Sequence, residues 1–304
     1  MKPVILDVDT GVDDALAIAY AARSPELELI ALTTCFGNIT VEEATRNSLK
    51  ILELLEKDIP VISGADKPLK REKKKEYARN VHGEDGLGNA LRKPPAAGRA
   101  SGNHAAEFII EQLKKRPHEI TIISVGPLTN LALAIQQAPE IARLAGEVIV
   151  MGGAVDVPGN VTPAAEANVY SDPEAAELVL QSGIMPTLIG LDVTLKTVLP
   201  KAKLAAWRAQ NTEIGRFFAE MTEFYIQFYE SKYPGIGGCA LHDPLAVGVA
   251  VDRSFVRTVP RHVQVVTEGP ELGRTAPADK EANALVAVEV DAERFVQHFL
   301  SRVP

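Results

Sequence analysis

One stretch near the amino terminus constrains the fold more than any other part of the chain. Residues 4–18 read VILDVDTGVDDALAI, an apolar run followed by four aspartates within eight residues. The run predicts a short buried strand, and the Ala- and Leu-rich segment after Gly11 predicts a helix. The acids therefore lie at the carboxyl end of a strand and the amino end of a helix, where open α/β sheets bind ligands.

Four carboxylates this close together need a partner that offsets their mutual repulsion. Asp13 and Asp14 alone are ordinary for the first turn of a helix, where acids complement the dipole. Together with Asp7 and Asp9 they cannot all stay ionised without a cation or a proton nearby. Because every ligand atom is an oxygen, a hard divalent metal ion is the expected partner.

The rest of the chain alternates between predicted strands and predicted helices. Strands are expected over residues 27–35, 59–62, 120–125, 147–151 and 185–191, and helices over 41–57, 105–115, 131–136, 174–181 and most of 200–233. This alternation indicates parallel βαβ units. We predict an α/β fold, with a single open, mostly parallel central sheet flanked by helices, a Rossmann-like core and an active site at the carboxyl ends of the strands. Residues 256–266 and 284–290 are expected as edge strands, and residues 1–304 as one domain.

Composition narrows the function classes. The net charge of −8 argues against nucleic acid or an anionic membrane as a partner. Cys35 and Cys239 form neither a disulfide framework nor a metal-ligand spacing, which is typical of free thiols in a reducing compartment. Asp7 and Asp9 interrupt any signal-peptide core, and no apolar run reaches the length of a membrane span. We expect a cytoplasmic globular protein.

Several later polar residues follow predicted strands and are candidates for the same site. Asn38 follows the second strand, and Asn160, Glu166 and Asn168 come from a loop suited to holding vicinal hydroxyls, although such residues are also common turn formers. His82 opens a glycine-rich segment, 82–88, that is either a mobile flap or a long connector.

The second half of the chain adds a further acid and an aromatic pair. His242 and Asp243 lie between a glycine-rich segment and an apolar helix over 245–251, and Asp243 can complete a metal cage begun at the amino terminus. Tyr225 and Tyr229 lie near the end of the long helical region. Their spacing is typical of core packing, and it is also suited to lining a pocket for a flat ring.

Residues 7–15, DVDTGVDDA, resemble the amino-terminal signature of the nucleoside hydrolases of the inosine-uridine preferring type. The likeness continues in family order through FGN at 36–38, HGEDGL at 82–87, GPLTN at 126–130, MGG at 151–153 and HDP at 242–244. The resemblance implies hydrolysis of the N-glycosidic bond of ribonucleosides (inosine, uridine and related) to ribose and free base, in purine and pyrimidine salvage.

The resemblance also implies roles for individual residues. One Ca²⁺ ion would be held by Asp9, Asp14, Asp243 and the main-chain carbonyl of Val125, with Asp9 as general base on a calcium-bound water. The residues that resemble the family's ribose-binding set are Asp13, Asn38, Met151, Asn160, Glu166 and Asn168. His242 resembles the family's proposed acid, Tyr225 and Tyr229 would line the base pocket, and His82 is a candidate substrate contact. Family members are often tetramers or dimers, so a homo-oligomer is expected.

Two features bear on the preferred substrate. Ala167 stands where the family commonly has a bulky aromatic residue, which loosens the wall near the ribose 5′ end. Trp207, the single tryptophan, lies in the long helical region and has no clear match to the base-stacking tryptophans of purine-specific relatives. We therefore expect a broad or inosine-uridine preference.

A phosphatase and a nucleoside-binding sensor are the two rival functions. Residues 7–10, DVDT, also resemble the nucleophile motif of haloacid dehalogenase-type phosphatases, but no convincing lysine and second acid pair follow on later strand ends. A nucleoside-binding sensor would need the ribose contacts without a carboxylate base beside a metal-bound water. The phosphatase also leaves Asp13, Asp14 and Asp243 without a role.

Overall fold

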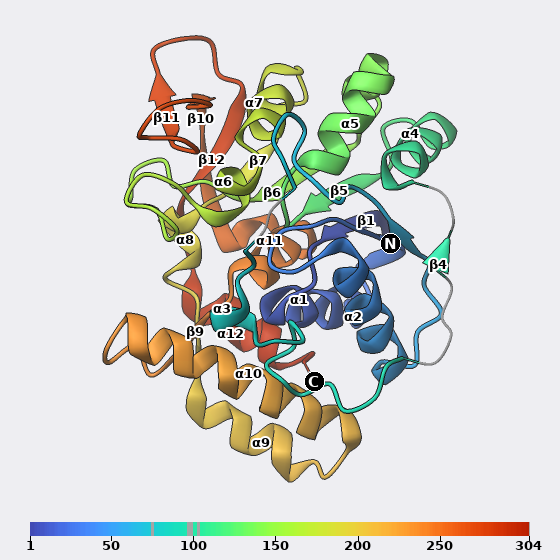
Figure 1. The fold of residues 1–304 in the computed structure, drawn as a ribbon, viewed down its shortest axis with the longest axis vertical. Coiled ribbons are helices and arrows are strands. Elements are labelled where there is room, and N and C mark those ends of the chain that lie inside the picture. Colours follow the sequence, from blue (N-terminus) through green and yellow to red (C-terminus); the bar gives the residue numbers. More distant parts are fainter. Residues whose placement is uncertain (74–75, 96–99, 102–103, 304) are drawn as a thin grey trace.

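The computed structural model describes residues 1–73, 76–95, 100–101 and 104–303 (Figure 1). Ten strands of these residues form one sheet in the order β11-β10-β12-β7-β6-β5-β1-β2-β3-β4. Their bounds are β1 (Lys2–Val8), β2 (Leu27–Thr34), β3 (Val61–Ser63), β4 (Ala100–Ser101), β5 (Thr121–Ser124), β6 (Glu147–Met151), β7 (Thr187–Ile189), β10 (Val256–Val265), β11 (Thr275–Ala278) and β12 (Ala284–Val290). Neighbours from β12 to β4 run parallel, and β10 is antiparallel to both of its neighbours. The predicted open, mostly parallel sheet is confirmed.

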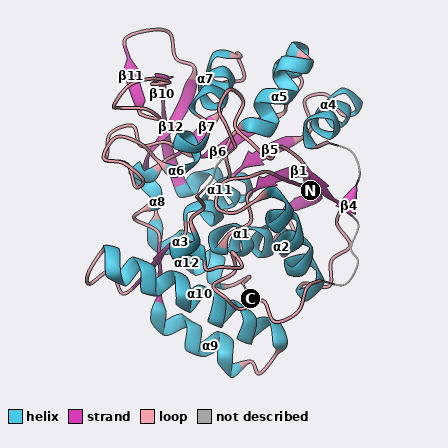
Figure 2. Cartoon of the chain, in the orientation of Figure 1, coloured by secondary structure: helices cyan, strands magenta, loops and turns pink. Residues whose placement is uncertain are grey.

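Helices cover both faces of the sheet, which forms the magenta layer between them in Figure 2. One face packs against α1 (Val12–Ala22), α2 (Val41–Leu54), α10 (Glu213–Lys232), α11 (His242–Val251) and α12 (Ala292–Leu300). The other packs against α4 (Ala105–Lys115), α5 (Thr129–Gln137) and α7 (Pro173–Gln181). The remaining elements are α3 (Arg79–His82), α6 (Ala167–Ser171), α8 (Leu191–Thr194), α9 (Leu204–Ala209), the antiparallel pair β8 (Val198–Pro200) and β9 (Gly238–Ala240), and short 3₁₀ turns at Pro139–Arg143, Lys201–Lys203 and Arg253–Phe255.

Strand β1 lies in the interior of the sheet, between β2 and β5. Val4 and Leu6 contribute to the core under α1, and Ile5 contributes to the core under α5, as the alternation of a strand requires. All three side chains are fully inaccessible, which explains the continuous apolar run in the sequence. The carboxyl end of β1 is therefore packed on both faces. The aspartates that follow it, Asp9, Asp13 and Asp14, start from a well-fixed position.

The carboxyl-terminal strands differ from expectation. Residues 256–266 and 284–290 are expected at an edge, but β10 lies between β11 and β12, and β12 lies between β7 and β10. The edge is formed by β11. Pro277 in β11 has no N–H to donate, which suits an edge position. Ala284, Val286 and Ala287 of β12 are buried, as an interior strand requires.

Helix α11 begins at His242, earlier than the predicted start at residue 245. Pro244 is tolerated there because first-turn N–H groups have no partner within the helix. His242 and Asp243 therefore lie in the first turn of a buried helix rather than in a loop. No helix in the described ranges combines the length and apolarity needed to span a membrane.

Candidate active site

Acidic side chains from both ends of the chain meet at the carboxyl end of β1. Asp9 follows β1, Asp13 and Asp14 lie in the first turn of α1, and Asp243 lies in the first turn of α11, which packs against α1. All four are buried. One carboxylate oxygen each of Asp13, Asp14 and Asp243 lies within 4.8 Å of the other two. The fold thus brings together the acids that the sequence placed at opposite ends.

Backbone and amide donors orient this acidic cluster. The Asp14 carboxylate accepts the backbone N–H of Asp9 at 3.0 Å, the backbone N–H of Gly11 at 2.9 Å and the Asn38 amide at 3.2 Å. Asp9 Oδ2 accepts the backbone N–H of Asn38 at 2.6 Å. Asp9 Oδ1 and Asp13 Oδ1 are buried and have no hydrogen-bond partner within the described ranges. Leaving such oxygens unsatisfied is costly, and a bound cation would satisfy them.

Burial raises the pKa of every acid in the cluster. The pKa of Asp14 rises to about 7, and those of Asp9 and Asp243 rise well above their usual value. The second cause in each case is repulsion by a neighbouring carboxylate. Crowded, desolvated carboxylates favour a proton or a positive ion. With oxygen donors only, this cluster can hold a hard metal ion.

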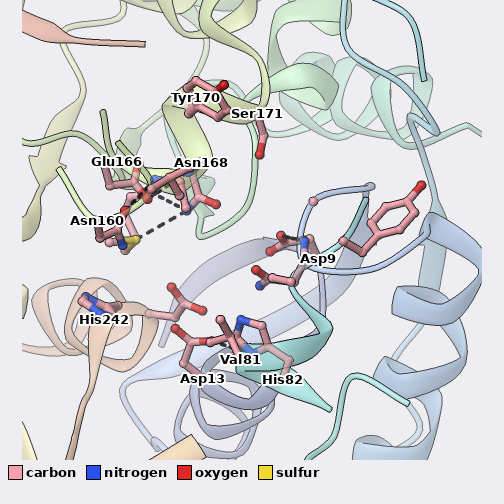
Figure 3. A pocket seen from close by; sticks show the side chains of 18 of the residues that line it. Asp9, Asp13, Val81, His82, Asn160, Glu166, Asn168, Tyr170, Ser171 and His242 are labelled. Atoms are coloured by element: carbon pink, nitrogen blue, oxygen red, sulfur yellow. Dashed lines mark hydrogen bonds and ion pairs between the residues drawn. The ribbon is translucent and has the colours of Figure 1, made fainter. Parts of the chain in front are cut away.

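A second polar wall faces the acids across a cavity (Figure 3). Glu166 caps α6 and accepts backbone N–H groups of Asn168 at 2.8 Å, Val169 at 3.1 Å and Gly153 at 3.0 Å. The Asn168 amide in turn donates to the Val125 carbonyl at 2.7 Å and to the Met151 carbonyl at 3.1 Å. The wall is thus built around one buried glutamate.

Asn160 completes this wall from the preceding loop. Its Oδ1 accepts the backbone N–H of Ala167 at 3.0 Å. The side chain therefore fixes the start of α6, and Asn160, Glu166 and Asn168 lie together in Figure 3. Ala167 also lines the cavity, between Glu166 and Asn168 in the sequence.

A chain of hydrogen bonds runs along one end of the cavity. Tyr225 donates to Asp13 Oδ2 at 3.0 Å and lies 3.4 Å from the Tyr229 hydroxyl. The Tyr229 hydroxyl lies 2.5 Å from His242 Nε2, and His242 Nδ1 lies 2.7 Å from the Thr194 hydroxyl. Burial lowers the pKa of His242 to about 4, and Asp13 opposes this only in part. The imidazole is therefore neutral near neutral pH.

His82 lies at the base of the cavity opposite Asn168. Its Nδ1 accepts the backbone N–H of Val12 at 3.1 Å, and its ring stacks on Tyr225 with centroids 5.4 Å apart. The glycine-rich segment that follows is fastened, since the Asp85 carboxylate accepts backbone N–H groups from Leu87, Asn89 and Leu91, at 2.7, 2.8 and 2.8 Å. In the structure these hydrogen bonds hold the segment in place as a connector.

The cavity has a volume of about 570 Å³. Of the residues that the sequence singled out as site candidates, all line it except two of the four amino-terminal acids. Asp14 accepts hydrogen bonds from Asp9 and Asn38, and Asp7 lies within the sheet. Sequence reasoning missed Lys232 and Tyr233 in the lining. Lys232 is the last residue of α10 and Tyr233 follows it, three and four residues after Tyr229, so helical spacing was the available signal.

Comparison with known proteins decides the family. Residues 4–297 match the family model described as inosine-uridine preferring nucleoside hydrolase. The chain belongs to this family. It is 40% identical to the pyrimidine-specific ribonucleoside hydrolase RihA of Salmonella arizonae, over 99% of this chain and 98% of that protein.

Solved structures of this family superimpose closely on the chain. A purine-preferring ribonucleoside hydrolase from Gardnerella vaginalis has a TM-score of 0.95 and 43% identity, over 99% of this chain and 98% of that one. A plant nucleoside hydrolase, PpNRh1, has a TM-score of 0.94 and 36% identity over the same shares. The predicted family, fold and enzyme class are confirmed. Membership of the family favours the hydrolase over both rival functions.

Proposed function

We propose that the chain hydrolyses the N-glycosidic bond of ribonucleosides, inosine and uridine among them, with Ca²⁺ held by Asp9, Asp14, Asp243 and the Val125 carbonyl. The observation that carries this proposal is the buried acidic cluster with unsatisfied oxygens, facing amide donors across the cavity. Asp13 lies close enough to Asp14 and Asp243 to share in the cluster. When bound, the ion would neutralise the carboxylates and make a coordinated water easier to deprotonate.

Polar side chains on both sides of the cavity suit the ribose. Asp13, Asn38, Asn160, Glu166, Asn168 and Met151 would hold its hydroxyls, since carboxylate oxygens accept and amides both donate and accept. Cleavage builds positive charge at the anomeric carbon. Carboxylates and carbonyl oxygens already in place stabilise that charge without reorganising. The acids therefore serve the sugar as well as the ion.

Asp9 is the proposed general base. Its Oδ1 is buried and has no hydrogen-bond partner in the described chain, so it is available to accept a proton from a water in the cavity. The water oxygen bonds to the anomeric carbon, its proton passes to Asp9, and the bonding electron pair leaves with the base.

The leaving base then needs a proton or a hydrogen-bond donor. His242, 2.5 Å from the Tyr229 hydroxyl, is the proposed acid, and because its imidazole is neutral it would act by donating a hydrogen bond to the leaving base. The Tyr225–Asp13 contact extends this chain of hydrogen bonds. Tyr225, Tyr229 and His82 would enclose the ring. Because either the Tyr229 hydroxyl or the His242 imidazole can donate a hydrogen bond, the site can accept purine and pyrimidine bases, which supports a broad substrate preference.

The wider setting is also proposed. We infer a single domain over 1–304, a cytoplasmic role in purine and pyrimidine salvage, and a homo-oligomer, either a tetramer or a dimer. The continuous sheet supports a single domain. Membership of the nucleoside hydrolase family supports the salvage role and the homo-oligomer. Sedimentation velocity of the purified protein tests the oligomer.

Ribose release from inosine, uridine and cytidine, with and without a calcium chelator, tests the activity. We expect release that the chelator abolishes and calcium restores, and a loss of about a thousandfold or more in Asp9→Ala. Asp66→Asn is the matched control, because Asp66 pairs with Lys73 on the surface outside the cavity. Absence of ribose release from every nucleoside, with phosphate release from a phosphoester, would establish the phosphatase instead.

A further inference from the structure

The last turn of α10 brings a cation to the cavity. Lys232 lines it beside Tyr229 and His242, the end that the base would occupy. Its Nζ donates to the Asn160 carbonyl at 2.6 Å and lies 5.6 Å from the ring centroid of Phe228. These contacts hold the ammonium at the junction between α10 and the loop before α6.

Lys232 differs from the other lysines and arginines near the site. Arg71 also lines the cavity, but Glu174 accepts two hydrogen bonds from it, at 2.9 and 2.8 Å. Lys201, which contacts the same helix, pairs with Glu230 at 3.0 Å. Within the described ranges, Lys232 forms no ion pair with a carboxylate. An ammonium has three donors, and the Asn160 carbonyl occupies one, so two can reach a ligand.

The chemistry of the leaving base gives these donors a target. As the sugar–base bond breaks, its electron pair moves onto the base. In uracil and hypoxanthine that charge reaches the carbonyl oxygen at C4 and at C6, respectively, and this oxygen accepts a hydrogen bond from a cation. In cytosine and adenine an amino group takes the place of that oxygen, and an amino group presents N–H donors toward the ammonium.

We propose that Lys232 is a specificity-determining residue that favours ribonucleosides whose base has a carbonyl oxygen at C4 of a pyrimidine or C6 of a purine, uridine and inosine, over their amino counterparts, cytidine and adenosine. The inference rests on the proposed function and adds the contact that selects the base. Lys232 donates a hydrogen bond to the carbonyl oxygen as charge builds there, and no proton transfer from the ammonium is needed. Charge-assisted hydrogen bonds are stronger than neutral ones, so the contact strengthens in the transition state.

Paired substrates separate this role from a structural one. Lys232→Met keeps the aliphatic stem and removes the donors, and Lys232→Arg restores a cation. If Lys232 only fastened Asn160 to α10, its loss would lower kcat/KM equally for all four nucleosides. Lys201→Met is the matched control, because it removes a lysine from the same helix's surroundings without touching the cavity.

We expect Lys232→Met to lower kcat/KM for uridine and inosine by about tenfold or more, and for cytidine and adenosine by less than about threefold. Lys232→Arg should recover most of the preference, and Lys201→Met should change none of the four values. Calorimetry with the free bases supplies a second readout, in which the variant should lose affinity for hypoxanthine and keep it for adenine.

Other results overturn the inference. An equal loss on all four nucleosides, unchanged ratios, or a wild type that prefers cytidine and adenosine would each remove Lys232 from base selection. A wild type that releases ribose from none of the four would overturn the proposed function itself. An active wild type with unchanged ratios leaves that function standing and overturns only the role of Lys232.

Discussion

Asp7 is the one acid of the amino-terminal motif that belongs to the sheet rather than to the site. The Thr33 hydroxyl donates to its Oδ1 at 2.5 Å and the Asn130 amide at 2.8 Å. Its Oδ2 is buried and has no hydrogen-bond partner in the described chain. Burial raises the pKa of Asp7 to about 6, although both hydrogen bonds oppose the shift. The folded state therefore favours the protonated form.

The free energy of unfolding of Asp7→Asn, compared with that of the wild type, tests whether Asp7 is protonated in the folded state. Because the pKa is higher in the folded state than in the unfolded one, the contribution of Asp7 is complete below pH about 4 and is lost as pH rises through about 6. The wild type should lose about 2–3 kcal/mol relative to the variant between about pH 4 and pH 8. Urea unfolding at both pH values, in chelator, measures the difference. A pH-independent difference would contradict the assignment.

Tyr229→Phe tests the hydrogen-bond chain at the base end. We expect kcat/KM for inosine to fall by about a hundredfold or more, since the hydroxyl beside His242 Nε2 is lost. The loss should be the same at about pH 6 and pH 8, because a His242 with a pKa of about 4 is neutral at both. Tyr233→Phe is the control, because that ring stacks on Tyr229 and its hydroxyl has no hydrogen-bond partner in the described chain. A loss of kcat/KM that differs between about pH 6 and pH 8 would show that His242 titrates in the range of an ordinary histidine.

At the level of elements, the sequence predicted those parts that local pattern dictates. The β1–α1 unit was predictable because a buried strand, a glycine and a dense set of acids occur together. Strands β8, β9 and β11 were missed, since each is three or four residues long and depends on a partner far along the chain. Lys232 was missed because a lysine in the last turn of a helix usually complements the helix dipole.

The segment after His82 can be loosened without touching the cavity. Asp85→Ala removes the acceptor for three backbone N–H groups, so His82 should lose its fixed position over Tyr225. We expect KM to rise by about threefold to tenfold, with faster amide exchange over residues 83–91. Asp85→Asn keeps the Oδ1 acceptor and should show a smaller effect. Equal exchange rates in wild type and Asp85→Ala would show that the carboxylate does not hold the segment.

The whole molecule should respond to the ion. If Ca²⁺ binds only the folded chain, a concentration about 100 times Kd adds about 2.7 kcal/mol, which for a chain of 304 residues raises Tm by about 4 °C. Asp243→Asn should unfold at a higher temperature than wild type in chelator, because one of the crowded buried charges is gone, and should gain less from calcium. Scanning calorimetry of both proteins measures this. An equal calcium shift in both would place the ion elsewhere.

The close packing of α11 on α1 has a consequence for how the protein is made. The ribosome releases Asp9 and Asp14 more than 200 residues before Asp243. A nascent chain can thus pair β1 with β2 long before the last acid exists. The acidic cluster cannot be complete before α11 has emerged and docked. If the cluster holds the proposed ion, that ion can stabilise the late, docked state of the chain and cannot guide the early pairing of β1 with β2.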